Sequence, residues 1–280
     1  MIDLHVHTTA SDGQYTPTQI IQAAAEKEFK AIAITDHDTL AGIPEAKEAA
    51  KQFNVNFIPG IEININTNRG EFHLLGLGIK ETSSSMQTVI DNLIQNRNNR
   101  NLQMIEKMQA DGLDICMEDF EKVFPNTVIG RPHIAQMLVR KGIVKTSQQA
   151  FDKYLAQGRK YFVQRAGTNL DEAIMAIRDS GGVPVLAHPM SLYLSWGKLP
   201  DILQNYYERG IAGLEAYHPG ARRSECARLE ELGKKIGYFI TAASDFHGEK
   251  VRADRKLGYT VDKRKIDDRF YFEELLPHLK

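Results

Sequence analysis

Residues 2–13, IDLHVHTTASDG, carry the pattern that decides the fold of this chain. His5 and His7 lie two apart, so a β-strand would turn both imidazoles to one face and Leu4 and Val6 to the other. Asp12 follows in the next loop. In a βα barrel these polar groups would lie at the carboxyl end of a strand, where active sites are built. One such pair is weak evidence by itself, because a hydrogen-bonded polar pair is the commoner explanation.

The same pattern recurs at the ends of later apolar runs. Asp245 and His247 are again two apart, and eight of the nine histidines fall in such segments or in Arg131-Pro132-His133. The later segments are Thr35-Asp36-His37-Asp38, Glu62, His73, Ala187-His188-Pro189, Tyr217-His218-Pro219 and Ser244-Asp245-Phe246-His247-Gly248. Histidines that only fill a core would not gather at successive strand ends. We therefore expect one site assembled from the whole chain.

Apolar runs alternate with helical patterns, which indicates an α/β fold of βα units with a mainly parallel sheet. The expected strands are Ile2–His7, Ala31–His37, Asn56–Asn64, Glu71–Leu77, Val183–His188, Gly213–His218 and Tyr238–His247. The expected helices outside the middle region are Pro17–Lys27, Ile43–Gln52, Asp171–Ser180, Leu199–Glu208 and Arg222–Lys235. Between Ser85 and Arg165 the apolar residues recur only at helical spacing. We therefore expect a barrel-like domain in residues 1–84 and 166–280, interrupted by an all-helical insertion at 85–165 that carries the Arg131-Pro132-His133 motif.

The composition excludes several classes of protein. Lys+Arg number 35 and Asp+Glu 36, so the chain lacks the basic excess that grips long nucleic acid, and we expect no binding to long duplex DNA. Cys116 and Cys226 are far apart and form no CxxC, which argues against a disulfide framework and for a cytoplasmic protein. No apolar run approaches the roughly 18 residues of a membrane span, and the strand expected from Ile2 leaves no room for a cleaved signal peptide. The composition gives no oligomeric state.

The candidate site is chemically a metal site. Imidazoles mixed with carboxylates, without thiolates, suit Zn²⁺, Mn²⁺ or Fe²⁺. The candidates are too many for one tetrahedral ion, and two or three ions that share a carboxylate would use them better. Such a cluster acts on a phosphate ester by lowering the pKa of water and by holding the oxygens of an in-line displacement.

With these residues in hand, the sequence resembles the PHP family, the polymerase and histidinol phosphatase phosphoesterases. The resemblance covers nearly the whole chain, and the ordered set of motifs is specific although each motif alone is not. These motifs are DLHVHTTASDG, AITDHDT, GIEIN, FHLLGLG, IGRPHIAQML, VLAHP, EAYHPG and SDFHG. The chain looks most similar to the branch that contains RNase AM and the nucleoside 3′,5′-bisphosphate phosphatases, which also carries a helical insertion with an RPH motif.

The resemblance implies a distorted (β/α)7 barrel with a trinuclear metal site. It assigns the ligands in three groups, with Glu62 as the bridge between the first and the second. The first ion would be held by His5, His7, Glu62 and Asp245, the second by Glu62, His73 and His188, and the third by Asp12, His37 and His247. The implied ions are three divalent cations, with Mn²⁺ expected first and Fe²⁺ or Zn²⁺ as alternatives.

Arg131 and His133 are the expected contacts to a substrate phosphate, because arginine is shaped to bind phosphate through two hydrogen bonds and the family uses this motif for that purpose. His218 is not needed as a ligand. It would bind phosphate or protonate the leaving oxygen, or else donate a hydrogen bond to the metal cluster. Asp36 and Asp38, on either side of a proposed histidine ligand, would orient that histidine or cap the following helix.

Two further features are expected to be structural. Arg97 and Arg100 lie three apart, within a polar stretch, and we expect them on an exposed helix face. The aromatic residues around Trp196, Tyr193 among them, are expected to pack a loop rather than to stack on a base.

The sequence thus predicts a metal-dependent phosphoesterase of small nucleotides. We expect it to remove the 3′-phosphate of nucleoside 3′,5′-bisphosphates and to trim short 5′-phosphorylated RNA in the 5′→3′ direction. The alternatives are a histidinol-phosphate phosphatase or general phosphomonoesterase, then a metal-dependent amidohydrolase, and finally a metal-binding module without catalytic activity. No membrane partner is expected.

Overall fold

The computed structural model describes residues 1–68, 70–125 and 127–279. Its centre is a ring of seven strands in the order β1-β2-β3-β4-β5-β6-β7. The strands are β1 Ile2–Asp3, β2 Ala31–Ile34, β3 Phe57–Asn64, β4 His73–Leu77, β5 Val183–Leu186, β6 Gly213–Tyr217 and β7 Phe239–Ala242. Beyond the two end strands, a parallel bridge pairs Val6 with Phe246, so the ring is nearly closed. The expected α/β barrel is confirmed.

One strand departs from the expected parallel arrangement. β4 runs antiparallel to both β3 and β5, whereas the other four neighbouring pairs are parallel. The segment between β3 and β4 is only eight residues long, and none of its described residues is in a helix. A parallel crossover needs a dozen or more residues, so the chain can only turn back.

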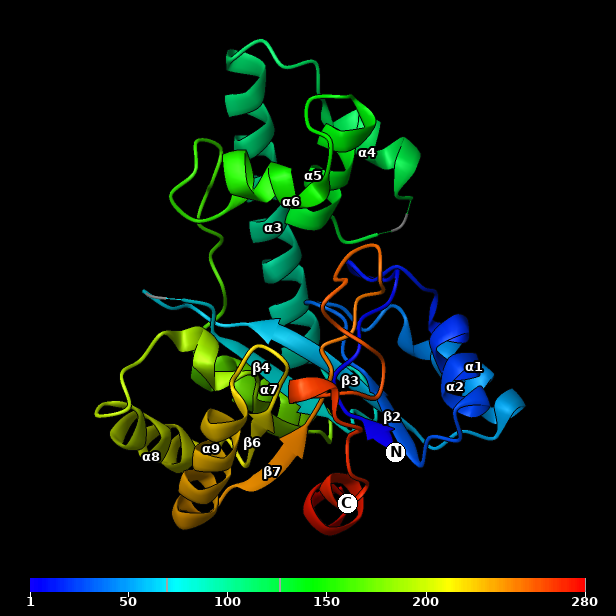
Figure 1. The fold of residues 1–280 in the computed structure, drawn as a ribbon, viewed down its shortest axis with the longest axis vertical. Helices are drawn as coiled ribbons and strands as arrows, with labels where there is room; N and C mark the ends of the chain where they lie inside the picture. Colours follow the sequence, from blue (N-terminus) through cyan, green and yellow to red (C-terminus); the bar gives the residue numbers. More distant parts are fainter. Residues whose placement is uncertain (69, 126, 280) are drawn as a thin grey trace.

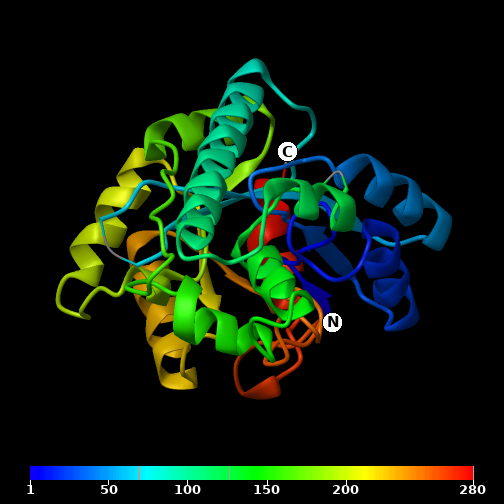
Figure 2. The ribbon, with the colours of Figure 1, turned by 90° about the horizontal axis from the view of Figure 1, so that it is seen from above.

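The helices surround and cap this ring. Those of the barrel are α1 Pro17–Glu26, α2 Ile43–Phe53, α7 Leu170–Asp179, α8 Leu199–Arg209 and α9 Arg223–Ile236. The middle of the chain forms α3 Ser84–Ala110, α4 Met117–Val123, α5 Arg131–Arg140, α6 Ser147–Ala150 and the π-helical turn η1 Phe151–Leu155. Short turns complete the chain at η2 Pro189–Leu192, η3 Val261–Lys263, η4 Phe270–Leu275 and η5 Leu276–His278. Figure 1 shows α3 rising from the barrel with α4, α5 and α6 beside its far half, and Figure 2 shows these helices above one end of the ring.

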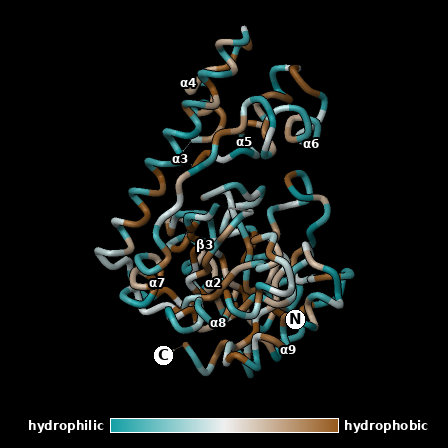
Figure 3. The backbone as a smooth tube through the Cα atoms, turned by 90° about the vertical axis from the view of Figure 1, so that its left-hand side faces the viewer, coloured by the Kyte–Doolittle hydropathy of each residue, from teal (hydrophilic) through white to brown (hydrophobic). Residues whose placement is uncertain are grey.

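The long helix α3 links two apolar cores. Met86 and Leu93, in its first half, pack with the strands of the barrel, whereas Met104 and Met108, in its second half, pack with α5 and the turns that follow. Hydrophobic and hydrophilic stretches accordingly alternate along α3 (Figure 3). None of the helices in the described ranges is both long and apolar enough to cross a membrane. The division of the chain at residues 84/85 and 165/166 stays a prediction.

Candidate metal centre

One end of the barrel brings the expected ligands together, at the carboxyl-terminal ends of the parallel strands and at the amino-terminal end of the reversed strand β4, where His73 lies. His5 and His7 follow β1, Glu62 lies in β3, and His188 and Asp245 follow β5 and β7. Eight of the nine residues predicted as ligands are buried, and the side chain of the ninth, His37, is only 15% exposed. Four sets of three or four of their ligand atoms lie within 4.8 Å of one another. These sets are His7, Asp12, His37 and His247; His5, His7 and Asp245; His5, Glu62 and His188; and His37, Glu62 and His73.

Glu62 lies at the centre of these sets. Its Oε1 is 2.8 Å from His73 Nδ1 and 2.9 Å from His188 Nε2. Its Oε2 lies 3.4 Å from His5 Nε2 and 3.3 Å from His7 Nε2. The two oxygens of one carboxylate therefore face different groups of histidines. This is the geometry that a bridging carboxylate needs.

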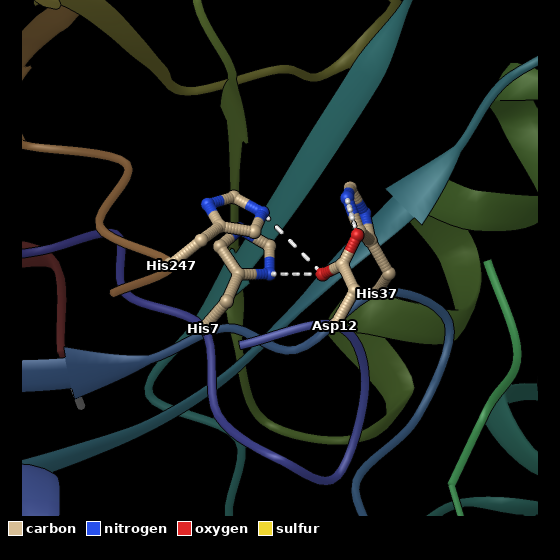
Figure 4. A group of neighbouring side chains, drawn as sticks. All are labelled: His7, Asp12, His37 and His247. Atoms are coloured by element: carbon tan, nitrogen blue, oxygen red, sulfur yellow. Dashed lines mark ion pairs between the residues drawn. The ribbon is translucent and has the colours of Figure 1, made fainter. Parts of the chain in front are cut away.

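Asp12 lies at the centre of a second group of histidines. Its Oδ1 is 3.3 Å from His247 Nε2 and 3.8 Å from His7 Nδ1, and its Oδ2 is 3.9 Å from His37 Nε2. Figure 4 shows these side chains converging from three separate segments of the chain. The loop after β1 thus adds a carboxylate to histidines that come from β2 and β7.

The backbone at two of these residues is held in an unusual conformation. His188 and Asp245 have φ angles of 26° and 53°, in the left-handed region that residues other than glycine rarely adopt. Such conformations cost free energy of order 1–3 kcal/mol each and persist where the surroundings impose them, commonly at functional sites. The strand ends therefore turn these side chains toward the centre at some cost in stability.

The side chains present fit divalent cations. His7 Nδ1, His37 Nδ1 and Glu62 Oε2 are buried and make no hydrogen bond of good geometry among the described residues, although His37 Nδ1 lies only 2.8 Å from Glu62 Oε2. Buried polar atoms without partners are costly, and their lone pairs face one another here. Cations between them would satisfy these atoms. The mixture of imidazole and carboxylate groups is the donor set of Mn²⁺, Fe²⁺ or Zn²⁺.

The charges at this centre support ionised carboxylates. Burial by itself raises the pKa of Glu62, but His37, His73 and His5 outweigh it and hold that pKa well below its usual range. Burial also raises the pKa of Asp12, but His247 and His37 outweigh it and hold that pKa well below its usual range. Anionic oxygens are therefore available at neutral pH.

One buried acid at the centre escaped the sequence analysis. Glu215 of β6 is fully buried; its Oε1 lies 3.0 Å from His5 Nδ1, and its Oε2 accepts a hydrogen bond from the His188 backbone N–H at 2.7 Å. A carboxylate that accepts a hydrogen bond from one imidazole N–H directs the other ring nitrogen toward a metal. The signal in the sequence was a single acid within the apolar strand Gly213–Tyr217.

We expect Glu215→Gln to lower the affinity for the divalent ion about 10- to 100-fold, which is the usual effect of removing a partner that orients a histidine ligand. Titration of metal-free protein measures this affinity. The matched control is Glu48→Gln, because Glu48 lies on α2 with its side chain 74% exposed. An unchanged affinity in Glu215→Gln would contradict the orienting role.

A cavity of about 570 Å³ opens over the centre and has strongly cationic walls. Arg97 of α3 and Arg165 both donate to Asp38 Oδ2, at 2.6 and 2.5 Å. Arg100 is 6% exposed and has no hydrogen-bond or ion-pair partner among the described residues. The expectation that Arg97 and Arg100 lie on an exposed face is therefore wrong, because α3 turns them toward the barrel. Three nearly buried cations around one carboxylate form a site for an anion.

The two acids beside His37 have other partners than expected. Asp36 accepts hydrogen bonds from the Thr8 backbone, the Thr8 hydroxyl and the Ser11 hydroxyl, and so fixes the loop that carries Asp12. Asp38 is the acceptor of the arginines just described. No side chain caps the amino end of α2. Within the described residues, neither acid orients the His37 ring or caps this helix, so both alternatives were wrong.

The three remaining predicted site residues, Arg131, His133 and His218, lie in different parts of the structure. Arg131 lines the cavity and pairs with Glu71 at 2.9 Å. His133 is buried, accepts the Gly130 N–H at Nδ1 and is not among the residues that line the cavity. Burial lowers the pKa of His133 to about 4, so this ring is neutral at neutral pH.

His218 lies against Asp245, one of the predicted ligands. Its Nε2 is 3.2 Å from Asp245 Oδ2, and its Nδ1 accepts the Gly220 N–H at 3.0 Å. Since Nδ1 is an acceptor, the ring proton is on Nε2 and points to Asp245. This is the contact expected of a hydrogen-bond donor to the cluster.

A family model for the PHP domain matches residues 3–166. The chain belongs to the PHP domain family. A 5′-3′ exoribonuclease from Haemophilus influenzae is 31% identical over 88% of this chain and 89% of its own. A 3′,5′-nucleoside bisphosphate phosphatase from Chromobacterium violaceum is 29% identical over 93% of this chain and 92% of its own.

The PHP fold extends through the later strands as well. The crystal structure of a proposed metal-dependent phosphoesterase from Bifidobacterium adolescentis superposes with a TM-score of 0.86 and 30% identity, covering 98% of this PHP chain and 95% of its own. The similarity therefore includes β5–β7, whose ends supply His188, Asp245 and His247. The resemblance found in the sequence is confirmed.

Proposed function

We propose that this PHP protein is a metal-dependent phosphoesterase of small nucleotides. It removes the 3′-phosphate of nucleoside 3′,5′-bisphosphates and trims short 5′-phosphorylated oligoribonucleotides from the 5′ end. The observation that carries the proposal is a cluster of buried histidines and acids under a cavity with arginine walls. The names of the relatives from Haemophilus influenzae and Chromobacterium violaceum agree with both activities.

We assign the nine strand-end residues to three divalent ions, Mn²⁺ in the first place. His5, His7, Glu62 and Asp245 hold one ion; Glu62, His73 and His188 hold the second; Asp12, His37 and His247 hold the third. The mutual distances of these atoms support the grouping. Bound ions lower the pKa of water toward neutrality and neutralise charge on the phosphate oxygens.

The remaining residues of the cavity bind and orient the substrate. We assign Arg131, which lines the cavity, to the terminal 5′-phosphate, together with His133, which lies two residues further along α5 and outside the cavity lining. The helical segment 85–165 thereby supplies recognition, and the barrel supplies the chemistry. Because the anchor holds the 5′ end, the next phosphorus along the chain lies over the centre.

The same bond breaks in both substrates. The oxygen of water forms a bond to the scissile phosphorus, the bond from phosphorus to O3′ of the first nucleoside breaks, and O3′ takes up a proton. We assign His218 to this step, as a contact to the phosphate or as the donor of that proton, or else to the support of Asp245, to which its Nε2–H donates at 3.2 Å. The products are a nucleoside 5′-monophosphate and either inorganic phosphate or a shortened 5′-phosphorylated chain.

The experiment that tests the function compares kcat/KM of the Mn²⁺-loaded protein for four substrates. These are pAp, AMP, histidinol phosphate and a 5′-phosphorylated oligoribonucleotide. We expect pAp and the oligoribonucleotide to be preferred over the two monoesters, because only they place a 5′-phosphate on the anchor and a second phosphate at the centre. A preference for histidinol phosphate would overturn the nucleotide assignment.

We expect Arg131→Ala to lower kcat/KM for both preferred substrates about 10- to 150-fold, the value of a lost charged hydrogen bond of about 1.5–3 kcal/mol. Steady-state kinetics measure the loss, and Arg140→Ala, at the exposed far end of the same helix, is the matched control. If Arg131→Ala retained the kcat/KM of the unaltered protein, the anchoring role would be wrong.

A further inference from the structure

A second cavity, of about 230 Å³, adjoins the metal centre on the side of β6 and β7. Its walls include His218, Arg252 and Arg255. It shares His188 and Asp245 with the larger cavity, so the two cavities meet at the centre. A substrate whose phosphorus lies at the centre therefore has room on both sides.

The two cavities are lined by different arginines, apart from one that they share. Arg97, Arg100, Arg131 and Arg165 line only the larger one, whereas Arg255 lines only the smaller one. Arg252 lies at the border and lines both. The proposed function uses the first set for a 5′-phosphate and leaves the second set without a role.

The cations of the smaller cavity are not fully neutralised. Arg252 and Arg255 share one partner, Asp254, at N···O distances of 3.2 and 3.4 Å, and the Asp254 side chain is 61% exposed. Arg255 itself is 5% exposed at the side chain, and its Nε has no hydrogen-bond partner among the described residues.

The other acids of this cavity are already engaged. Glu215 faces His5, Asp245 faces His218, and Glu71 pairs with Arg131. Arg252 and Arg255 therefore keep guanidinium N–H groups that Asp254 does not fill, and these groups suit a phosphate.

An aromatic side chain lies at the border of the two cavities. Tyr193 lines both cavities. Its side chain is 74% exposed, more than any other large hydrophobic residue in the described part of the chain. Its backbone has φ 51° and ψ 39°, a conformation that is strained for a bulky residue. The expectation that the aromatics here pack a loop holds for Trp196, which packs against the core and under Arg228, and stays a prediction for Tyr193, which is mostly exposed with its ring close to Gly70.

We infer that the smaller cavity binds the second nucleotide of an oligoribonucleotide substrate, the one joined through its 5′-oxygen to the scissile phosphorus. The base of this nucleotide stacks on Tyr193, and its 3′-phosphate lies against Arg252 and Arg255. A nucleoside 3′,5′-bisphosphate has no second nucleotide, so it leaves this cavity to water. The inference rests on the proposed function and adds the feature that separates its two substrate classes.

The test is the ratio of kcat/KM for the 5′-phosphorylated dinucleotide pApAp to kcat/KM for pAp. We expect Tyr193→Ala to lower this ratio at least about fivefold, since stacking on one base is worth 1 kcal/mol or more. Tyr193→Phe keeps the ring and should keep the ratio. Arg252→Ala should also lower the ratio, because only the dinucleotide presents a phosphate to this side chain.

Arg131→Ala serves as the matched comparison, because both substrates carry the 5′-phosphate and their kcat/KM values should fall together. A ratio within twofold of the unaltered protein in both Tyr193→Ala and Arg252→Ala overturns the inference. So does an equal fall in Tyr193→Phe and Tyr193→Ala. Failure of the proposed function would be seen separately, because the unaltered protein would then cleave neither substrate. Equilibrium binding of pApAp and pAp to the metal-free variants gives the same ratio without turnover.

Discussion

Removal of divalent ions is expected to lower kcat/KM for pAp by at least about a thousandfold, and addition of Mn²⁺ is expected to restore it. Without cations the pKa of water is not lowered toward neutrality, and the charge of the phosphate oxygens is not neutralised, which together account for several kcal/mol of barrier. Glu62 Oε2 lies within 3.4 Å of three histidine nitrogens and makes no hydrogen bond of good geometry, so it is one of the atoms that a cation would satisfy.

The measurement uses protein stripped by a chelator and then dialysed, with metal content determined before the assay. Chelator supplied together with excess Mn²⁺ is the control for direct effects of the chelator. Phosphatase activity that neither falls on stripping nor returns with Mn²⁺ would rule out a metal-dependent enzyme. It would leave a metal-binding module as the better account of the chain.

Glu62→Gln is expected to have a comparable effect. The two oxygens of Glu62 face separate groups of histidines, so this one change removes the charge that the two groups share. We expect kcat to fall by about a thousandfold or more and the metal content to fall by at least one ion per chain. Steady-state kinetics and elemental analysis measure the two effects.

Glu48→Gln is again the matched control, because it makes the same chemical change on an exposed helix face. Circular dichroism before and after heating separates loss of metal from loss of fold. A Glu62→Gln protein that kept its full metal content and its kcat would contradict the bridging assignment, although the other ligands could still be correct.

The fold was largely predictable because its elements have local causes. β2 is the run Ala31–Ile34, wholly apolar and wholly buried, as expected for a parallel strand covered on both faces. Helix α1 begins after Thr16, which forms a capping box with Gln19 and is followed by Pro17. The reversal of β4 was missed, because the direction of a strand depends on how the connecting segment crosses the sheet and not on the strand's own residues.

The predicted strands at the site extended too far for a related reason. The sequence suggested Ile2–His7, but the continuous strand ends at Asp3; the chain then bends at Leu4, and Val6 pairs with Phe246 only through an isolated bridge. Similarly, β7 ends at Ala242, before Asp245 adopts its left-handed conformation. The demands of the site override the local preference for extended strand at these ends.

The sequence by itself determined the histidines and acids at the strand ends, because their two-residue spacing and their place after apolar runs are local properties. Only the tertiary structure decided which residues stand behind and around them. Glu215 became a partner of His5 through the closing of the barrel, and Arg100 became buried through the path of α3. Tyr193 reached the border of two cavities through a turn after β5. Burial and charge compensation depend on contacts between distant segments, and no local pattern encodes those contacts.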